Sequence, residues 1–188
     1  MTAAQLTTLR NFVNANAGEF GSVSHDSDGA SAIRDALNKA ASPAFFVWHT
    51  ALPVSSIFDS VLWASLTPTD APDGTQLWAN RSLACQGKQF NLQTLLIGSS
   101  GVVNASKPNV RQGLQDALTN VASGVGGAAT NAGWATLKDG MSRTATRVEK
   151  LFAGTGGALD GSTAAKAGTL TFEGELAVAD VVSAMGWF

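Results

Sequence analysis

The sequence predicts a mainly α-helical fold, a small helical bundle with a short C-terminal β-strand or hairpin segment and a terminal helix. Three observations support this class. Apolar residues recur at steps of three and four residues along several stretches, which is the spacing of one face of a helix. Capping residues and prolines stand before these stretches, and glycines follow several of them. The stretch TLTFEGEL near the C-terminus instead alternates as a strand does.

The first helix is predicted to run from Thr2 to about Ala17. Thr2 followed by Gln5 is a capping-box pattern. The apolar positions that follow at helical spacing are Leu6, Leu9, Phe12 and Val13. Gly18 and Gly21 then break this helix.

A second helix is predicted after the stretch SVSHDSDG, whose Ser and Asp residues can cap its start. The residues expected on its buried side are Ile33, Ala36, Leu37 and Ala40. Ser42-Pro43 stops this helix, because the residue before a proline disfavours helical backbone angles.

The most apolar stretch is AFFVWHTALPVSSIFDSVLWASL, which contains Pro53. Proline is well tolerated in a first helical turn, so PVSSIFDSVLWASL is predicted to be a third helix and AFFVW a short buried segment, extended or helical. A longer helix is predicted from about Thr75 to Ile97, weakened by about 1 kcal/mol at Gly87. Its apolar positions are Leu77, Leu83, Phe90, Leu95, Leu96 and Ile97.

Ser106 before Lys107-Pro108 is a good helix start. The apolar stripe of this helix is Val110, Leu114, Ala117, Leu118 and Val121. A further helix contains Trp134, Leu137 and Met141. After a weak point at Gly140, the stretch SRTATRVEKLFAG predicts one more helix.

That helix would begin at a cap provided by Ser142 or Thr144 and would end with a left-handed residue at Gly154. Its inward face would be Val148, Leu151 and Phe152. Lys150 would lie in its last turn, where a cation interacts favourably with the helix dipole.

The predicted domain organisation is a helical domain over residues 1–153, followed by an arm over residues 154–188. The arm comprises the Gly-rich loop GTGGALDGSTAAKAG, the strand TLTFEGEL with a turn at Gly174, and a short helix in AVADVVSAMGWF.

The bulk composition excludes several classes of function. The net charge of −2 and the pI near 5.6 argue against general electrostatic binding to nucleic acid, although a local basic strip stays open. Charged residues make up 14% of the chain, against a usual figure of about 25%, which indicates a surface covered by partners or one that is polar without being ionic. The single cysteine, Cys85, excludes an intrachain disulfide.

No signal-peptide or membrane-span pattern occurs, so we expect the protein to be kept in the cytosol or in particles assembled there.

Catalytic residues, metal ligands and cofactors are not predicted. His25, Asp26 and Asp28 suit helix capping better than a metal loop, because further ligands are missing after Gly29. His49 is expected to be partly buried, and no motif pairs it with a nucleophile.

The candidate interface residues lie in the last third of the chain. Arg143, Arg147 and Lys150 follow steps of four and three, which would place them on one helical face. This face could be solvated, contact an acidic partner, or contact nucleic acid. Leu170 and Phe172 belong to the predicted strand, which could add to the edge of another sheet.

The terminal pair Trp187 and Phe188 could dock onto its own domain or insert into a neighbouring subunit. Burial of such large side chains is favourable by about 1.5 to 3 kcal/mol or more each, so a free aromatic tail is unusual.

Four stretches carry a resemblance: SDGASAIRDALNKAASPAFFVWHTALPVSSI, SKPNVRQGL, TRVEKLFAG and LTFEGELAVADV. In this order and spacing they resemble a family of tailed-bacteriophage proteins that have no assigned function and are encoded among virion structural genes. The likeness spans most of the chain, but ACQGKQFNLQTLLIGSSGVVN and the glycine-rich stretch before LTFEG depart from the family pattern. The resemblance implies a role in the head, neck or tail of the particle, and it supplies no catalytic residues.

We therefore expect a non-enzymatic virion structural protein, preferably a head-to-tail (neck) adaptor or completion protein that forms a homo-oligomeric ring between portal and tail. The arm would gain order by packing on a neighbouring subunit. A capsid decoration or minor tail protein is one alternative, and a phage-encoded enzyme or host-directed inhibitor is another. The expected partners are portal, tail or capsid subunits, without membrane or sequence-specific nucleic acid. The expected location is the virion, assembled in the bacterial host cytoplasm.

Overall fold

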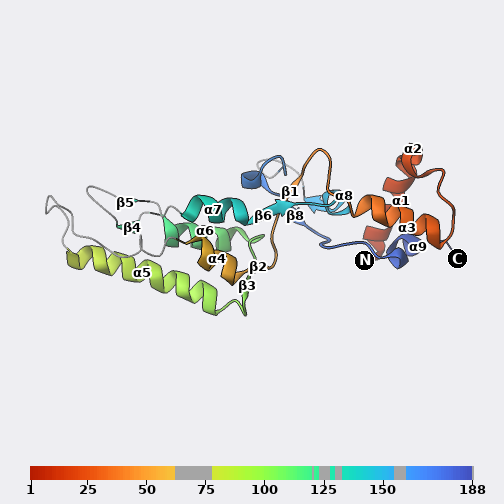
Figure 1. Cartoon of the computed structure of the whole chain (residues 1–188). Coiled ribbons are helices and arrows are strands. Elements are labelled where there is room, and N and C mark those ends of the chain that lie inside the picture. Colours follow the sequence, from red (N-terminus) through yellow and green to blue (C-terminus); the bar gives the residue numbers. More distant parts are fainter. Residues whose placement is uncertain (62–77, 120, 123–127, 130–132, 155–159, 188) are drawn as a thin grey trace. The chain divides into compact units, whose positions relative to one another are not determined.

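The computed structural model describes residues 1–61, 78–119, 121–122, 128–129, 133–154 and 160–187 (Figure 1). The predicted fold class is confirmed: the structure is mainly helical, with a few short two-stranded antiparallel sheets. Predictions for residues 62–77, including the end of the third helix and the start of the fourth, lie outside the described part of the chain. None of the described helices is both long and apolar enough for a membrane span.

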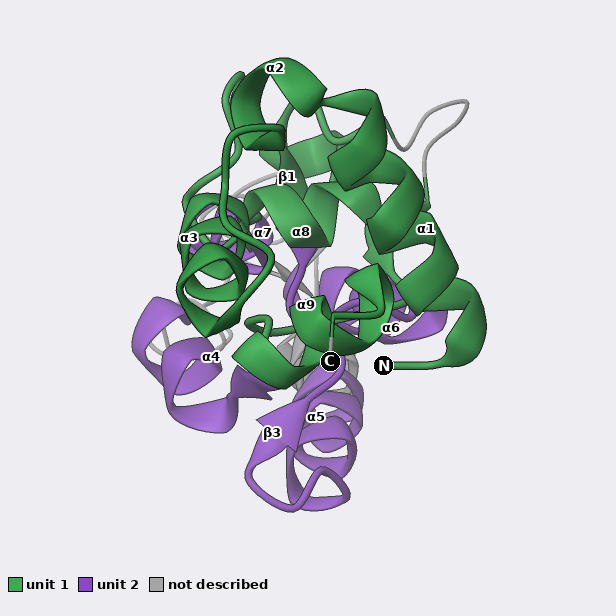
Figure 2. Cartoon of the chain, turned by 90° about the vertical axis from the view of Figure 1, so that its right-hand side faces the viewer, with its two compact units in different colours: residues 1–47, 143–188 green, residues 48–142 purple. Residues whose placement is uncertain are grey.

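The chain forms two compact units (Figure 2). Unit 1 combines Met1–Val47 with Arg143–Phe188, and unit 2 is Trp48–Ser142. Strands β1 (Phe46–Trp48) and β6 (Ser142–Thr144) pair with each other. The predicted boundary after residue 153 therefore does not separate these units, because the C-terminal segment shares a core with the N-terminal helices.

The elements of unit 1 are mostly short helices. They are α1 (Ala3–Ala15), α2 (Ala17–Phe20), α3 (Ser27–Leu37), α8 (Arg147–Leu151), the 3-10 helix η2 (Ala164–Lys166) and α9 (Val178–Met185). Two further strands, β7 (Ala153–Gly154) and β8 (Thr169–Leu170), pair antiparallel. Of the predicted strand TLTFEGEL, only the first two residues are in β8, and Gly174 has the positive φ of 104° that a turn requires.

Local capping explains where the first helices begin. Thr2 accepts from the backbone N–H of Gln5 at 3.3 Å, and the Gln5 side chain accepts from the backbone N–H of Thr2 at 2.8 Å, which is the predicted capping box. Asp26 caps α3 by accepting from the N–H groups of Asp28 and Gly29, both at 3.0 Å. The first predicted helix is thus confirmed, with its end at Ala15 rather than near Ala17.

The core of unit 1 joins the two ends of the chain, because α9 packs against both α1 and α3. Its buried residues are Leu9, Val13, Phe20, Ala30, Ile33, Leu37, Val148, Phe152, Leu176, Val181 and Ala184. Ile33 and Leu37 are buried as predicted, whereas Ala40 lies beyond the end of α3 and is exposed.

The helix predicted within SRTATRVEKLFAG is shorter than expected. Residues 142–144 form β6 instead of its first turn, and the cap is Thr146, which with Glu149 makes a second capping box. The helix ends at Leu151, so Gly154 lies in β7 and is not its left-handed cap. Lys150 does lie in the last turn, as predicted.

The helices in the described part of unit 2 are α4 (Val54–Ser60), α5 (Trp78–Ile97), α6 (Pro108–Leu118) and α7 (Gly133–Gly140). Its strands pair antiparallel, β2 (Leu52–Pro53) with β3 (Val102–Val103) and β4 (Val121–Ala122) with β5 (Ala128–Ala129). Helix α6 begins with Pro108 in its first turn, as predicted.

Helix α5 packs against α6, where the side chain of Leu95 lies beside Gly113. The predicted stripe of α6 is buried at Leu114, Ala117 and Leu118.

Candidate functional site

Glu149 is a buried carboxylate at the centre of a charged cluster in unit 1, with only 1% of its surface exposed. Arg143 donates to both of its oxygens, at 2.7 and 2.6 Å. One oxygen also accepts from the backbone N–H of Thr146 at 3.0 Å, and the other from that of Gly174 at 3.1 Å. The cluster therefore ties β6, the start of α8 and the turn before α9 together.

The electrostatics of this cluster favour the ionised pair. Burial by itself raises the pKa of Glu149, but the hydrogen bonds from Arg143, Thr146 and Gly174 outweigh it and hold that pKa below its ordinary value. The hydrogen bonds to Glu149 also raise the pKa of Arg143, and Glu173, 3.1 Å from the same guanidinium, adds to this effect. Both groups stay charged at neutral pH and are satisfied within the chain.

Arg147 is also paired within unit 1. Its guanidinium donates to both carboxylate oxygens of Glu19, at 2.6 and 2.7 Å, and lies 5.9 Å from the ring centre of Phe20. The hydrogen bond from Arg147 lowers the pKa of Glu19, and the pairing raises the pKa of Arg147. Because the pair is partly exposed, its net contribution to stability is of the order of 1 kcal/mol or less.

The three predicted basic interface residues do not share one helical face, because Arg143 lies on β6 and only Arg147 and Lys150 lie on α8. Lys150 contacts the backbone oxygen of Pro43 at 3.5 Å and lies 5.8 Å from the ring centre of Phe45. All three cations therefore interact with their own chain, which weakens the expectation of an open basic strip.

Leu170 and Phe172, predicted to contact a partner, are half-buried within unit 1. Leu170 packs against the small cluster of Ala41, Phe45, Val47 and Ala145. The ring centre of Phe172 lies 5.6 Å from that of Phe152, a residue of the main core of unit 1. The segment between β8 and α9 is thus packed on its own unit.

Trp187 follows the same pattern, because its ring stacks on that of His25 with centres 4.9 Å apart and planes 20° apart. Asn38 fixes the preceding turn, since its side chain accepts from the N–H of Leu176 at 2.9 Å and donates to the carbonyl of Leu176 at 3.2 Å. Of the two predicted outcomes for Trp187, the described structure shows docking on its own unit. Phe188 lies outside the described residues.

The predicted absence of a metal site remains a prediction, although the structure agrees with the capping role of Asp26. Among the described residues, no group of three or more His, Cys, Asp or Glu side chains could hold a metal ion. His49 is half-buried, and its backbone N–H donates to the carbonyl of Met141 at 3.0 Å. The side chain of Cys85 lies outside the part that the structure describes.

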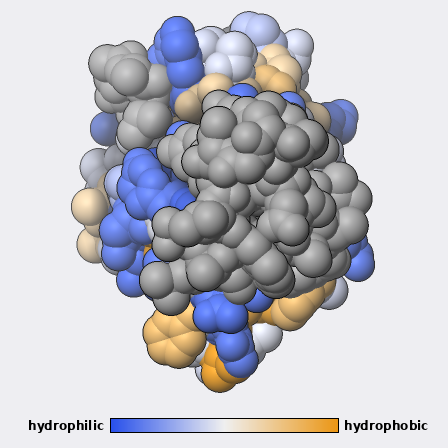
Figure 3. All heavy atoms as spheres, turned by 90° about the vertical axis from the view of Figure 1, so that its left-hand side faces the viewer, coloured by the Kyte–Doolittle hydropathy of each residue, from blue (hydrophilic) through white to orange (hydrophobic). Residues whose placement is uncertain are grey.

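Unit 2 carries the feature that sequence reasoning missed, an apolar surface on α4, α5 and β3. Its large exposed residues are Phe58 at 46%, Phe90 at 68%, Ile97 at 73% and Val102 at 45%. On the face drawn in Figure 3, apolar surface lies along the lower edge beside hydrophilic side chains. Of these four, Phe58 and Ile97 line one groove, and exposed apolar groups that lie together are typical of a contact surface.

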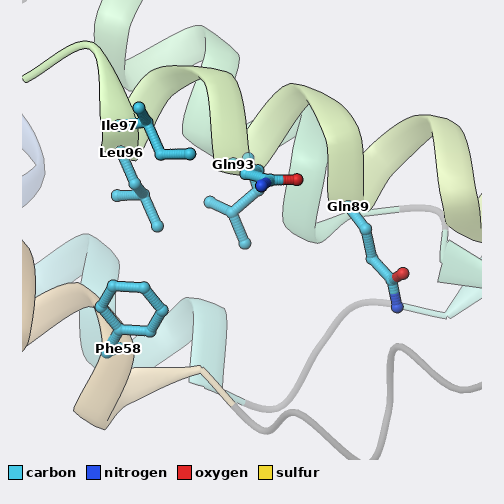
Figure 4. A pocket seen from close by; sticks show the side chains of 6 residues that line it. Phe58, Gln89, Gln93, Leu96 and Ile97 are labelled. Atoms are coloured by element: carbon cyan, nitrogen blue, oxygen red, sulfur yellow. The ribbon is translucent and has the colours of Figure 1, made fainter.

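A groove of about 500 Å³ runs between α4 and α5 on this surface. It is lined by Phe58, Gln89, Leu92, Gln93, Leu96 and Ile97. Phe58 points from α4 toward Leu96 and Ile97 of α5 (Figure 4). The groove holds amide and apolar groups without a titratable side chain, so it suits binding rather than acid–base chemistry.

A signal for this surface does exist in the sequence. The apolar positions predicted for the long helix include both Leu96, which is 7% exposed, and Ile97, which is 73% exposed. Two adjacent apolar residues on a helix point about 100° apart, so one of them can face away from the core.

Comparison of the chain with family models, with curated proteins and with solved structures gives no match.

Proposed function

We propose that this chain is a non-enzymatic structural protein of a tailed-bacteriophage virion, a head-to-tail (neck) adaptor or completion protein that assembles as a ring between portal and tail. Its place of action would be the virion, assembled in the host cytoplasm. The observation that carries an assembly role is the exposure of large apolar residues in unit 2, Phe58, Phe90 and Ile97, of which Phe58 and Ile97 line one groove. The resemblance of four stretches of the sequence to phage virion proteins supports the particle as its location.

The apolar surface supports assembly because the large exposed apolar residues of the described chain all lie in unit 2. In unit 1 the candidate basic residues are engaged internally, and the C-terminal segment packs on α1, α3 and α8. The C-terminal segment that was expected to be an arm is therefore folded on its own unit. We accordingly propose that unit 2 makes the contact with a neighbouring subunit. A ring would repeat each modest contact around its circumference, which stabilises the whole assembly.

The alternatives differ in what the apolar surface would contact. A capsid decoration protein would bind the outer capsid lattice, and a minor tail protein would bind tail subunits. An enzyme or host-directed inhibitor would use a site for a small molecule or host protein. No observation on the described residues favours any of these alternatives over the neck role.

The test is to mix the purified full chain with purified portal, tail and capsid proteins of the same phage and to measure complexes by light scattering and negative-stain imaging. We expect a ring seated on the portal. We also expect Phe90→Asp to weaken this complex, because Phe90 is exposed at the apolar surface, and Asn91→Asp on another face of α5 to leave it intact. Binding to capsid alone, to tail alone or to none of these proteins would overturn the neck assignment.

A further inference from the structure

The C-terminal strap, which we define as residues 171–187, is fastened to the rest of unit 1 through its main chain. Side chains from α1, from the end of α3 and from α8 hold its backbone N–H and C=O groups. The fastening side chains that the structure describes are Gln5, which donates to the carbonyl of Thr171 at 2.7 Å, Arg10, which donates to that of Ala184, Asn38, which bonds both backbone groups of Leu176, and Glu149, which accepts the N–H of Gly174 at 3.1 Å.

Among these fastening side chains, Glu149 is the one whose charge changes in acid. Gln5 and Asn38 carry neutral amides, and the guanidinium of Arg10 stays protonated. The carboxylate of Glu149, in contrast, can take up a proton. Because it holds the turn that leads into α9, a change in its charge acts on the N-terminal end of the strap.

The described partners of the Glu149 carboxylate are all donors. Arg143 donates two N–H groups, at 2.7 and 2.6 Å, and the backbones of Thr146 and Gly174 donate one each, at 3.0 and 3.1 Å. A protonated carboxyl group carries an O–H donor of its own, which needs an acceptor. Only 1% of Glu149 is exposed, so water has little access to it. A proton on either oxygen therefore faces donors, and at least one of these hydrogen bonds must break.

Arg143 is the charged group that faces Glu149 from β6. It also contacts Glu173 of the strap at 3.1 Å, so it keeps a carboxylate partner when Glu149 is neutral. Charged groups described on the elements nearby bind elsewhere: Arg147 pairs with Glu19 of α2, on whose pKa Lys39 also acts, Lys150 contacts Pro43, Arg34 pairs with Asp35 on α3, Asp180 of α9 accepts the N–H of Ala177, and His25 stacks on Trp187.

The hydrogen bond from Gly174 is the one that can break at least cost. It is the longest of those to Glu149, and Gly174 is exposed, so its freed N–H can bind water. Gly174 has a φ of 104°, and a Cβ built there would meet nothing within 4 Å, so the turn has room to change shape. Opening at this turn loosens the backbone that places Phe172 and Leu176 on the core of unit 1.

We propose that Glu149 is an acid-sensitive latch: uptake of a proton by its carboxylate opens the turn at Gly174 and frees the N-terminal end of the C-terminal strap, while unit 2 keeps its fold. The opening is local, because Asn38 and Arg10 do not change charge and keep their hydrogen bonds to Leu176 and Ala184. The latch lies within unit 1 and does not depend on the proposed role in a virion.

The test is amide hydrogen exchange of the purified full chain, followed residue by residue by NMR at a series of pH values. The amide of Gly174 reports the latch directly, because Glu149 is its acceptor. The pKa of Glu149 in the closed form lies below its ordinary value of 4.5, so between these two pKa values the open form binds more protons. Through this window we expect the protection factor of Gly174 to fall by up to about tenfold per pH unit. The amides of Leu176 and of Leu114 in unit 2 should keep their protection.

Glu149→Gln imitates the neutral state at pH 7, because its amide places an N–H₂ group among the same donors. We expect this variant to lose the protection of Gly174 at neutral pH and to show no further acid step at this amide. The matched control is Glu19→Gln, which makes the same change in a carboxylate that Arg147 holds with two hydrogen bonds away from the strap. This control should keep the wild-type titration of Gly174.

Protection of Gly174 that persists until the whole chain unfolds overturns the proposal. An acid step that is unchanged in Glu149→Gln also overturns it, because another group would then be titrating. Circular dichroism checks that each variant folds. If Glu149→Gln does not fold, the wild type and Glu19→Gln still decide, because the latch requires Gly174 to lose protection at a higher pH than Leu114 in both.

Discussion

Arg143 holds the buried carboxylate of Glu149 with two parallel hydrogen bonds of 2.7 and 2.6 Å. These residues are six positions apart and come from a strand and a helix. Because Glu149 also accepts the N–H of Gly174, the pair fixes the turn that leads into α9. The stability of unit 1 is therefore expected to depend on this ion pair.

Arg143→Ala should destabilise the protein by about 3 to 5 kcal/mol, because it leaves a buried carboxylate without its cation. The measurement is urea unfolding followed by circular dichroism. Arg34→Ala is the control, since the pair of Arg34 with Asp35 is largely exposed and should contribute about 1 kcal/mol or less. Equal losses in the two variants would show that Glu149 tolerates the loss of its partner.

The same pair predicts a dependence of stability on pH. The pKa of Glu149 is lower in the folded chain than its ordinary value of 4.5, so folding favours the charged form. Its contribution is fully present above about pH 4.5 and is lost as the pH falls through the folded pKa. Glu149→Gln should be less stable than wild type at pH 7, and the difference should shrink on acidification. Urea unfolding at a series of pH values checks this, and a difference that stays constant down to about pH 2 would argue against it.

Gly161 should not tolerate a side chain. Its φ is +70°, and a Cβ at this position would lie 2.2 Å from the buried ring of Phe45. Gly161→Ala should cost at least about 2 kcal/mol from strain and overpacking. Gly87→Ala in α5 meets no atom within 4 Å and should instead stabilise by about 0.5–1 kcal/mol. Thermal unfolding of both variants gives the comparison, and shifts of the same sign would contradict it.

Asp26 should act as a helix cap without any metal. Asp26→Ala should reduce stability, because two N–H groups of the first turn of α3 lose their acceptor. Asp35→Ala is the control, since it makes the same chemical change at an exposed position of α3 that caps no N–H group. Calcium and EDTA should both leave the melting temperature of the wild type unchanged. A calcium-dependent rise that disappears in Asp26→Ala would revive the metal-loop interpretation.

Helix starts could be read from the sequence where the capping signal was local and single. The capping box of Thr2 with Gln5 is a single clear signal before the apolar stripe of α1, and Pro108 is a single clear signal before that of α6. The start of α8 was harder, because Ser142, Thr144 and Thr146 can all cap. Pairing of β6 with β1, a contact between distant segments, takes residues 142–144 out of the helix. The match of Thr146 with Glu149 three residues later was the available signal.

The charge partners could not be read from the sequence. Arg147 and Glu19 are 128 positions apart, and helical spacing says nothing about such a contact. The helical stripe also did not separate Leu96 in the core from Ile97 at the surface, since that depends on which neighbouring helix covers α5. For the same reason the sequence did not reveal that unit 1 draws on both ends of the chain.

The division of unit 1 between Met1–Val47 and Arg143–Phe188 has a consequence for synthesis of the protein. On the ribosome, α1 and α3 emerge first but lack the helix that completes their core, so Leu9 and Ile33 stay uncovered while all of unit 2, Trp48–Ser142, is translated. Unit 2 is continuous and can fold during translation. Unit 1 can close only once α9 has left the exit tunnel, which makes the nascent N-terminal segment a natural client for chaperones.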